Sequence, residues 1–410
     1  MGLGSFLKRE FSFVSGNYRI LIISWIIMDI AMETPVPYYQ PYVQALGGDQ
    51  FPMALGVIGL ANFLAMAAVA FPGGYLADKY GRRWLITTMT FGLAFSYLFF
   101  ALAPSWHFIL IGTTIQGLCL IYQPALFAMV QDSLPAERRG VGSSLIQMIH
   151  GTFNTPGPVI GGLLTLAFGI VLGMRIVYVF VLILFTIAAI WRLRLKETIQ
   201  NTDPIRFKYF LSSYPQAFKE CCINVWKTVP RSVLWLFFVQ IMLMFANAQI
   251  NVINALYAID TLGIPEDLWW ITFIPLLVTM VIASIPIGKT IDRFGPKIPL
   301  LFGPVTLAAS ALIFAHGNFF TVMVSMCLNG LVFLLIMSSA MTLTANLVEP
   351  ENRGKVRGFL NFMGYIFMGV GMLLGNFFYN LIPQLPFYIT ASLTVPMIII
   401  IVFRVHESRK

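Results

Sequence analysis

Long apolar runs recur along almost the whole chain and are separated by short polar segments. Each run has the length of about 20 residues that an α-helix, with its rise of about 1.5 Å per residue, needs to cross the roughly 30 Å hydrocarbon core of a bilayer. The pattern predicts twelve membrane-spanning helices, called spans one to twelve from here on, at residues 18–43, 52–76, 84–103, 107–132, 141–170, 174–194, 232–260, 268–290, 297–316, 319–346, 357–381 and 386–404. Because charged and polar residues precede the first run, we expect it to be a span and not a cleaved signal peptide.

The composition excludes a soluble globular protein. Hydrophobic residues make up 58% of the 410 residues, charged residues make up only 10%, and the mean hydropathy is +0.81. Such values are typical of a chain whose surface faces lipid. The sequence therefore predicts an all-α, multi-pass protein embedded in the lipid bilayer of the cell membrane.

The basic residues lie in alternate loops. The segments before span one, between spans two and three, and between spans four and five are basic, and the alternation continues to the C-terminus, with Arg175 alone expected on the opposite side. Short basic loops stay in the cytoplasm, so both termini are predicted to be cytoplasmic. The formal charge of +9 is thus explained by topology, and we expect no nucleic-acid partner.

The chain also contains an internal repeat. The loop GYLADKYGRR at 74–83 matches GKTIDRFGPK at 288–297, and the same offset of 214 positions relates PAERRG at 135–140 to EPENRG at 349–354. Two unrelated loops that share one offset indicate a duplicated unit.

The repeat predicts the domain organisation. We expect an N-terminal six-helix bundle at 1–195 and a C-terminal six-helix bundle at 232–410. The segment 196–231 between them is predicted to be a cytoplasmic linker, and its interleaved aromatic and basic residues predict a short amphipathic stretch on the inner membrane surface.

These motifs resemble those of a known family. GYLADKYGRR is similar to the signature loop of the major facilitator superfamily, G-x-L-A-D-[RK]-x-G-[RK]-[RK], at every fixed position. The resemblance covers the whole chain through the repeat and the span count, and it implies twelve transmembrane helices in two six-helix pseudo-symmetric bundles. NTPGPVIGG at 154–162 resembles the GPxxGG motif of the proton-coupled antiporters in this superfamily, in particular the twelve-span drug exporters. The matching residues are Gly157, Pro158, Gly161 and Gly162.

One position departs from those exporters. They usually carry an arginine in span four, three residues before a Gln-Gly pair, whereas Thr113 stands there before Gln116 and Gly117. The resemblance implies a role in proton transfer for that arginine, so their particular relay is not expected here.

The signature loop is predicted to be a conformational latch. Glycines permit close helix approach and a tight turn, an aspartate is favoured near the start of span three, and its arginines lie within reach of Asp132. The resemblance implies that the loop holds the halves together on the cytoplasmic side when the cavity opens outward. The predicted latch residues are Gly74, Asp78, Gly81, Arg82, Arg83 and Asp132, with Asp292 and Gly295 in the second copy.

Two acids interrupt the first span. Asp29 and Glu33 lie near the membrane midplane, where a charge costs at least about 2.5–3.5 kcal/mol, and their spacing of four puts them on one helix face. Each raises the proton affinity of the other, and no lysine or arginine is expected in a span interior to neutralise them. Pro35 and Pro37 remove helical hydrogen bonds at the same depth, which is tolerated beside a wet cavity. We therefore predict a proton-coupling site at Asp29 and Glu33, with His150 of span five as a further candidate.

Polar residues inside other spans predict the walls of a substrate cavity. Span seven carries amides at helical spacing, and the resemblance implies that spans one, four, seven and ten line the pathway. The predicted cavity residues are Tyr38, Gln116, Tyr122, Gln123, Asn154, Asn247, Asn251, Asn254 and Asn329. For any one amide, a hydrogen bond between helices explains the pattern as well as a substrate contact does.

Three classes of function are compatible with these features. The first is a proton-coupled antiporter that exports amphipathic neutral or cationic small molecules; the second is a symporter or facilitator for a polar solute such as a sugar. The third, a sensor or a membrane-embedded enzyme, lacks a signalling domain or a reactive cluster in the sequence. We expect a monomer whose partners are protons and a small-molecule substrate, with no catalytic residues, no cofactor and no metal.

Overall fold

The structure is a computed structural model, and it describes residues 13–70, 72–73, 76, 81–135, 139–154, 156–199, 215, 218–219 and 229–406. Two predicted latch residues, Gly74 and Asp78, lie outside these ranges, as does most of the predicted linker with its amphipathic stretch. The described residues form helices and turns and contain no strand.

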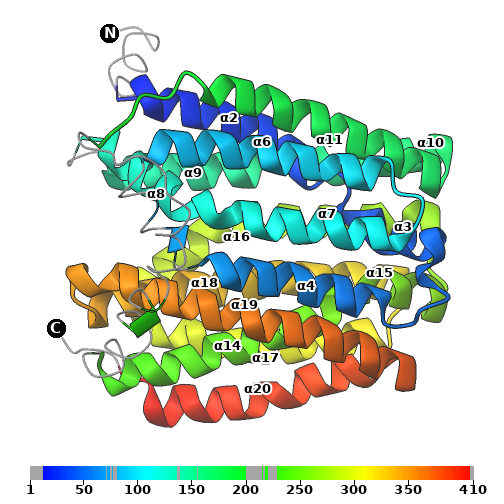
Figure 1. Cartoon of the computed structure of the whole chain (residues 1–410). Helices are drawn as coiled ribbons and strands as arrows, with labels where there is room; N and C mark the ends of the chain where they lie inside the picture. Colours follow the sequence, from blue (N-terminus) through cyan, green and yellow to red (C-terminus); the bar gives the residue numbers. More distant parts are fainter. Residues whose placement is uncertain are drawn as a thin grey trace, which may run out of the picture.

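The first half of the chain is a row of helices, several of which are broken within the predicted spans (Figure 1). They are α2 (Gly16–Met32), η1 (Val36–Tyr38), α3 (Tyr39–Val43), η2 (Gln44–Gly48), α4 (Ala54–Val69), α6 (Arg82–Ala101), α7 (Trp106–Cys119), η3 (Leu120–Tyr122), α8 (Gln123–Asp132), α9 (Arg139–Phe153), α10 (Pro156–Phe168) and α11 (Ile170–Arg192). Elements α2 to η2 form span one, α7 to α8 form span four, and α9 with α10 forms span five.

The second half repeats this plan. Its elements are α14 (Arg231–Asn251), α15 (Asn254–Leu256), η6 (Tyr257–Thr261), η7 (Glu266–Thr272), α16 (Phe273–Phe294), α17 (Lys297–Ala315), α18 (Phe319–Leu347), α19 (Pro350–Leu381) and α20 (Leu385–Arg404). Ten helices of the described residues are long and apolar enough to cross a membrane, and two shorter apolar helices coincide with spans two and five. The predicted all-α membrane protein is therefore confirmed.

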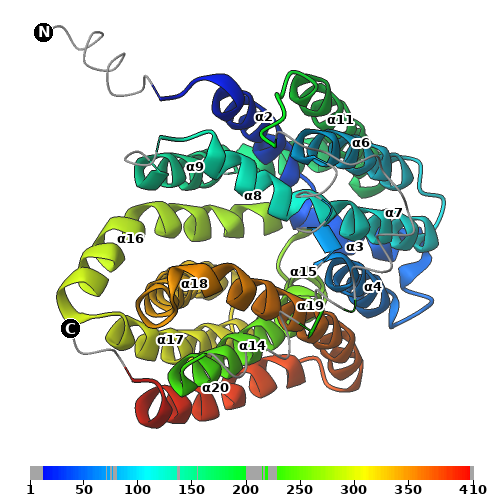
Figure 2. The same cartoon turned by 60° about the vertical axis from the view of Figure 1, so that its left-hand side comes forward.

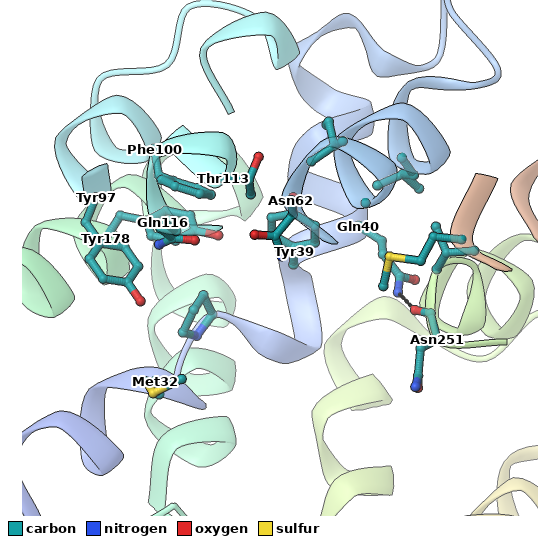
Figure 3. A pocket seen from close by; sticks show the side chains of 16 residues that line it. Met32, Tyr39, Gln40, Asn62, Tyr97, Phe100, Thr113, Gln116, Tyr178 and Asn251 are labelled. Carbon is teal, nitrogen blue, oxygen red and sulfur yellow. Dashed lines mark hydrogen bonds between the residues drawn. The ribbon is translucent and has the colours of Figure 1, made fainter. Parts of the chain in front are cut away.

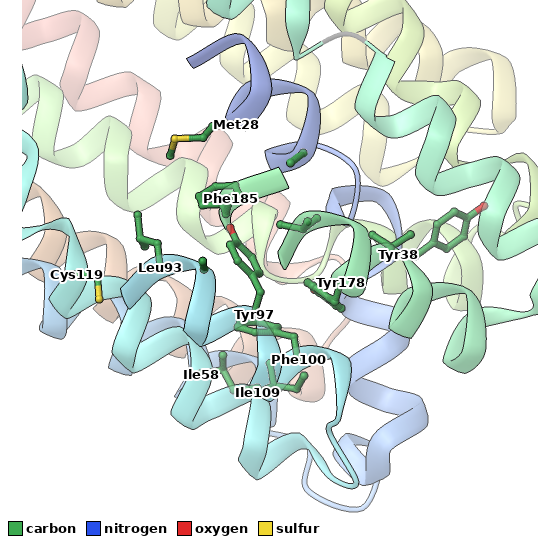
Figure 4. Packing of buried hydrophobic residues seen from close by; sticks show 14 of the residues in the cluster. Met28, Tyr38, Ile58, Leu93, Tyr97, Phe100, Ile109, Cys119, Tyr178 and Phe185 are labelled. Atoms are coloured by element: carbon green, nitrogen blue, oxygen red, sulfur yellow. The ribbon is translucent and has the colours of Figure 1, made fainter. Parts of the chain in front are cut away.

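The two halves lie side by side. In Figure 2 the helices α2 to α11 gather in one layer and α14 to α20 in the other, with α4 beside α19 at the boundary. Within the first layer, aromatic side chains fill the core (Figure 4): the rings of Tyr97 and Phe185 lie 4.9 Å apart, and so do those of Phe100 and Tyr178. Large buried aromatics of this kind supply much of the packing energy of a helical core.

Equivalent hydrogen bonds in both halves support the internal repeat. The hydroxyl of Tyr42 donates to the carbonyl of Phe100 at 2.7 Å, and that of Tyr257 donates to the carbonyl of Ala315 at 2.6 Å. Each bond ties the end of a half's first span to the end of its third span. At this place the two halves share the same side-chain contact.

Span one is broken where its prolines predict. Helix α2 ends at Met32. Beyond it, the carbonyl of Ala31 accepts from the backbone N–H of Thr34, and that of Glu33 accepts from the N–H of Val36, at 3.3 Å each. These bonds span three residues and replace the four-residue bonds of an α-helix. Span seven is also broken, between α14 and α15, although it has no proline there.

A glutamine joins the two breaks at the predicted outer end. Gln40 donates to the side-chain oxygen of Asn254 at 2.8 Å and accepts from the backbone N–H of Ala255 at 2.7 Å. The bond between Gln40 and Asn254 joins the end of span one to the end of span seven, across 214 positions of the sequence. The N–H of Ala255 at the start of α15 is shared between Gln40 and the side-chain oxygen of Asn254, which also lies at 2.7 Å.

Further contacts close this end. The indole N–H of Trp269 donates to the carbonyl of Pro37 at 2.9 Å, and the hydroxyl of Tyr38 donates to the carbonyl of Glu266 at 2.8 Å. Asn376 of α19 accepts from the backbone N–H of Gly56 of α4 at 2.9 Å. The predicted outer ends of the halves are thus held together by hydrogen bonds from spans one, two, seven, eight and eleven.

The Gly56 contact provides a test of this arrangement. A Cβ atom added to Gly56 would lie 3.0 Å from Cβ of Asn376, close to the separation of about 3.5–4.5 Å in disulfides. The double variant Gly56→Cys, Asn376→Cys is expected to cross-link under mild oxidation. After cleavage at a protease site introduced between the halves, the cross-linked chain should still migrate as one band in a non-reducing gel.

The matched control is Gly169→Cys with Asn376→Cys, because Gly169 lies in the first half and an added Cβ there meets nothing within 4 Å. It should separate into two fragments. Equal cross-linking of both double variants, or none in either, would contradict the packing of α4 against α19.

Candidate functional site

A buried carboxylate in span one contacts a histidine of span five. Asp29 lies in the last turn of α2 and is 3% exposed, and its Oδ2 atom lies 2.8 Å from Nδ1 of His150 in α9. The angles at this contact do not make it a regular hydrogen bond. The Trp25 ring lies edge-on to the imidazole, with ring centres 5.7 Å apart. The structure thus brings an acid and a base into contact within the bundle.

The second acid, Glu33, lies one turn further along, at the break of span one. It caps the C-terminal end of α2 and is partly exposed, within electrostatic range of Asp29 and of Tyr97 in α6. The structure therefore brings together the three residues predicted for proton coupling. Their roles remain predictions.

The GPVIGG segment packs directly on this break. A Cβ on Gly157 would lie 2.8 Å from the carbonyl carbon of Glu33, and one on Gly161 would overlap the carbonyl oxygen of Thr34. Gly162 faces the indole of Trp270 in the second half. The glycines are needed because α10 and span one approach too closely for any side chain, and Pro158 is buried beside them.

The second half uses the same device without the motif. Gly371 and Gly375 of α19 lie against the backbone of span seven, and an added Cβ at Gly371 would lie 2.7 Å from the carbonyl oxygen of Phe245. A pair of glycines thus supports the broken span in each half.

A cavity of about 250 Å³ opens beside the break. Figure 3 shows the aromatic side chains of Tyr97, Phe100 and Tyr178 on one part of its wall, and the ring of Tyr39 lies apart from them, beside Asn62. No charged side chain is among its lining residues. The other polar lining residues are four amides and one hydroxyl: Gln40, Asn62, Gln116, Asn251 and Thr113. Glu33 stands between the lining residues Met32 and Pro35. The cavity is suited to an apolar or aromatic molecule with a few polar groups.

The predicted cavity residues divide among several places. Gln116 and Asn251 line this cavity, whereas Gln123 lines a second one of about 230 Å³ between spans two, four and eleven, where the guanidinium of Arg357 lies over the Phe127 ring at 5.6 Å. A small pocket inside the second half is lined by Ser310, Ser325 and four amides, which are Asn247, Asn251, Asn254 and Asn329.

The other predicted cavity residues have individual positions. Tyr38 belongs to the outer-end contact, Tyr122 is buried in span four, and Asn154 lies at the α9–α10 junction. The side-chain oxygen of Asn154 is buried and has no hydrogen-bond partner among the described residues. Sequence reasoning missed the aromatic wall, because tyrosines and phenylalanines within apolar runs give no signal of which way they face.

The described latch residues form a cluster at the predicted cytoplasmic end. Arg82 pairs with Asp132, and the carboxylate of Glu197 accepts from the backbone N–H groups of Arg82 and Arg83 at 3.1 and 3.0 Å. Arg83 also donates to the carbonyl of Leu193 at 3.0 Å. These contacts connect spans three, four and six, all in the first half.

In the second copy of the loop, Lys297 occupies the position equivalent to Arg83 and donates to the carbonyl of Val402 at 3.1 Å. Gly81 and Gly295 both have positive φ, at 98° and 80°, which explains the glycine in each copy. Asp292 is exposed.

One expectation is wrong: a basic residue does lie inside the first bundle. Arg192, the last residue of α11, is fully buried. Its position at the cytoplasmic end of span six indicated a solvated flank. However, side chains lean toward the N-terminus of their helix, which here points back into the bundle.

The chain matches a known family over nearly its whole length. The family model of the Major Facilitator Superfamily matches residues 21–279 and 236–410. This match, together with the all-helical fold, defines the class: the chain belongs to the Major Facilitator Superfamily and is a transporter, not an enzyme.

Two curated relatives and two solved structures illustrate what this chain is similar to. The chain is 26% identical to the multidrug resistance protein MdtG of Serratia proteamaculans (strain 568) over 69% of its length and 68% of the relative's. It is also 26% identical to the multi-drug resistance efflux pump PmrA of Streptococcus pneumoniae serotype 4, over 69% and 67%. The human organic anion transporter MFSD10 has the same fold, with a TM-score of 0.70 at 17% identity over 93% of this chain and 98% of that chain. The nucleoside transporter NupG gives a TM-score of 0.70 at 15% identity over 95% and 99%.

The GPVIGG packing makes a direct prediction. Gly161→Ala should lower the melting temperature in detergent by several degrees, because its Cβ overlaps the Thr34 carbonyl and displacing that backbone costs about 1–3 kcal/mol. Gly288→Ala is the matched control: this glycine is also helical, and an added Cβ meets nothing within 4 Å. Its melting temperature should be unchanged or higher. If the two variants melt alike, the glycine is not needed for the close approach.

Proposed function

We propose that this chain is a proton-coupled antiporter that exports amphipathic neutral or cationic small molecules by alternating access. The observation that carries the proposal is the contact of Asp29 with His150, buried beside a break in span one that borders an uncharged aromatic cavity. The GPVIGG segment and the relatives named for multidrug resistance and multi-drug efflux add support.

Charge at the break selects the substrate in this mechanism. When Asp29 and Glu33 are ionised, they attract a cation into the cavity, and the rings of Tyr39, Tyr97 and Tyr178 stabilise it by cation–π and apolar contact. Protonation of the acids removes this attraction and favours release. Binding of the proton and binding of the substrate therefore exclude each other, which is the condition for exchange in opposite directions.

His150 connects the buried acid to water. The side chain of Asp29 is 5% exposed, whereas that of His150 is 34% exposed. A proton that reaches the imidazole from the aqueous side is passed to the carboxylate across their 2.8 Å contact.

Alternating access opens the two ends in turn. The hydrogen bonds of Gln40 and Trp269 close the predicted outer end, and substrate enters from the cytoplasm in this state. Release outward requires these bonds to break while the halves rock toward each other at the cytoplasmic end, where the latch residues stabilise the second state. We further propose a monomer with both termini in the cytoplasm.

A symporter or facilitator for a polar solute is the second candidate. The four amides around the small pocket of the second half favour it, because amide groups suit a solute with several hydroxyls. In that case the proton moves in the same direction as the solute, or does not move at all.

The test uses purified protein in proteoliposomes with a pH-sensitive dye inside and imposed gradients of lipophilic cations, neutral drugs or sugars. Cation or drug movement should drive protons in the opposite direction. Asp29→Asn and Glu33→Gln should each lower this coupled flux by at least about tenfold, whereas Asp49→Asn, at an exposed acid, should leave it unchanged. Proton movement in the same direction as a sugar would establish the second candidate instead.

A further inference from the structure

Arg192 is a buried cation held by hydroxyl groups. Its Nε atom donates to the hydroxyl of Ser24 in α2 at 2.9 Å, and its NH1 atom donates to that of Thr90 in α6 at 2.8 Å. The guanidinium carbon lies 5.7 Å from the centre of the Tyr122 ring in span four. Four spans of the first half therefore meet at this one side chain.

No carboxylate neutralises this charge within the part of the chain that the structure describes. Neither hydroxyl carries a charge, and the NH2 atom of Arg192 is buried without a hydrogen-bond partner there. A guanidinium stays protonated in proteins, so the interior of the bundle holds a fixed positive charge. Keeping such a charge out of water is costly unless it has a use or a distant partner.

The acids of span one are the candidates for that distant partner, because they lie on the same span as Ser24, which Arg192 contacts. Ser24 precedes Asp29 by five residues, a rise of about 7.5 Å along α2. The other titratable groups around these acids come from the elements packed on α2 and on the cavity. They are His150 of α9, Tyr97 of α6, Tyr122 of η3 and Tyr178 of α11. Unlike these groups, the guanidinium of Arg192 carries a charge that does not depend on pH.

We propose that Arg192 is a positioning residue for proton coupling: its fixed charge keeps Asp29 and Glu33 able to release a proton near neutral pH. The inference rests on the proposed function. It also explains why protonation expels a cation. With both acids protonated, the bundle interior carries the net charge of Arg192 and repels a positive substrate, whereas ionised acids reverse the sign.

The direction of the effect follows from electrostatics. A nearby positive charge favours the ionised form of an acid. At an effective dielectric of about 20, a unit charge about 10 Å away shifts a titration by about one pH unit. Removing the charge of Arg192 should therefore move the protonation midpoint of the acids upward by about that amount.

Infrared difference spectroscopy measures this midpoint directly, through the carbonyl band of protonated carboxyl groups in the purified protein. The band is assigned by its loss in Asp29→Asn and Glu33→Gln. We expect a midpoint about one pH unit higher in Arg192→Gln and Arg192→Met, and a wild-type midpoint in Arg192→Lys, which keeps the charge. The control Arg175→Gln changes an arginine at the other end of α11 that donates to the carbonyl of Ala103, and it should not move the midpoint.

The substitutions separate electrostatics from structure. If Arg192 only ties helices together, Arg192→Met lowers the melting temperature but leaves the midpoint in place, and the inference is overturned. A midpoint that moves equally in Arg192→Lys overturns it as well. The titration needs no transported substrate, so a chain without proton-coupled transport would refute the proposed function while this measurement still decides the role of Arg192.

Discussion

The placement of one carboxylate, that of Asp29, in the low-dielectric interior of the bundle constrains the rest of the structure. A charge at that depth must be protonated, paired or reached by water. The contact with His150, whose side chain is 34% exposed, gives the carboxylate both a basic partner and a neighbour that reaches water. The break of span one follows one turn further along and borders a cavity. The close approach at Gly157 and Gly161 then holds the broken span in position.

Because of the internal repeat, a broken first span of this kind occurs in both halves. A pair of glycines supports each one, and the two broken spans are joined at the predicted outer end by the hydrogen bond between Gln40 and Asn254. Hydrogen bonds between amides are strong enough to hold one state and weak enough to exchange for others, since each contributes about 0.5–1.5 kcal/mol net. Two nearly equal arrangements of rigid halves are what alternating access requires.

The sequence predicted the elements but not the directions of side chains. The apolar runs, the repeat and the prolines of span one were sufficient for the helices and the first break, because these depend on local chemistry. The aromatic cavity wall and the inward orientation of Arg192 were missed, because the sequence of an apolar run does not indicate which neighbouring helix a tyrosine or arginine faces. The break of span seven has no proline, and it follows from the contact with Gln40 across the halves.

The most direct test of the account measures protons released when substrate binds. Purified protein in weakly buffered detergent solution is mixed with tetraphenylphosphonium, a lipophilic cation, and the released protons are counted against bound cation between pH 6 and 9. The account predicts proton release on binding, with a maximum near the protonation midpoint of Asp29 and Glu33, and none in the double variant Asp29→Asn, Glu33→Gln. Binding of the cation without proton release at any pH would contradict the claim that proton and substrate compete for the same site.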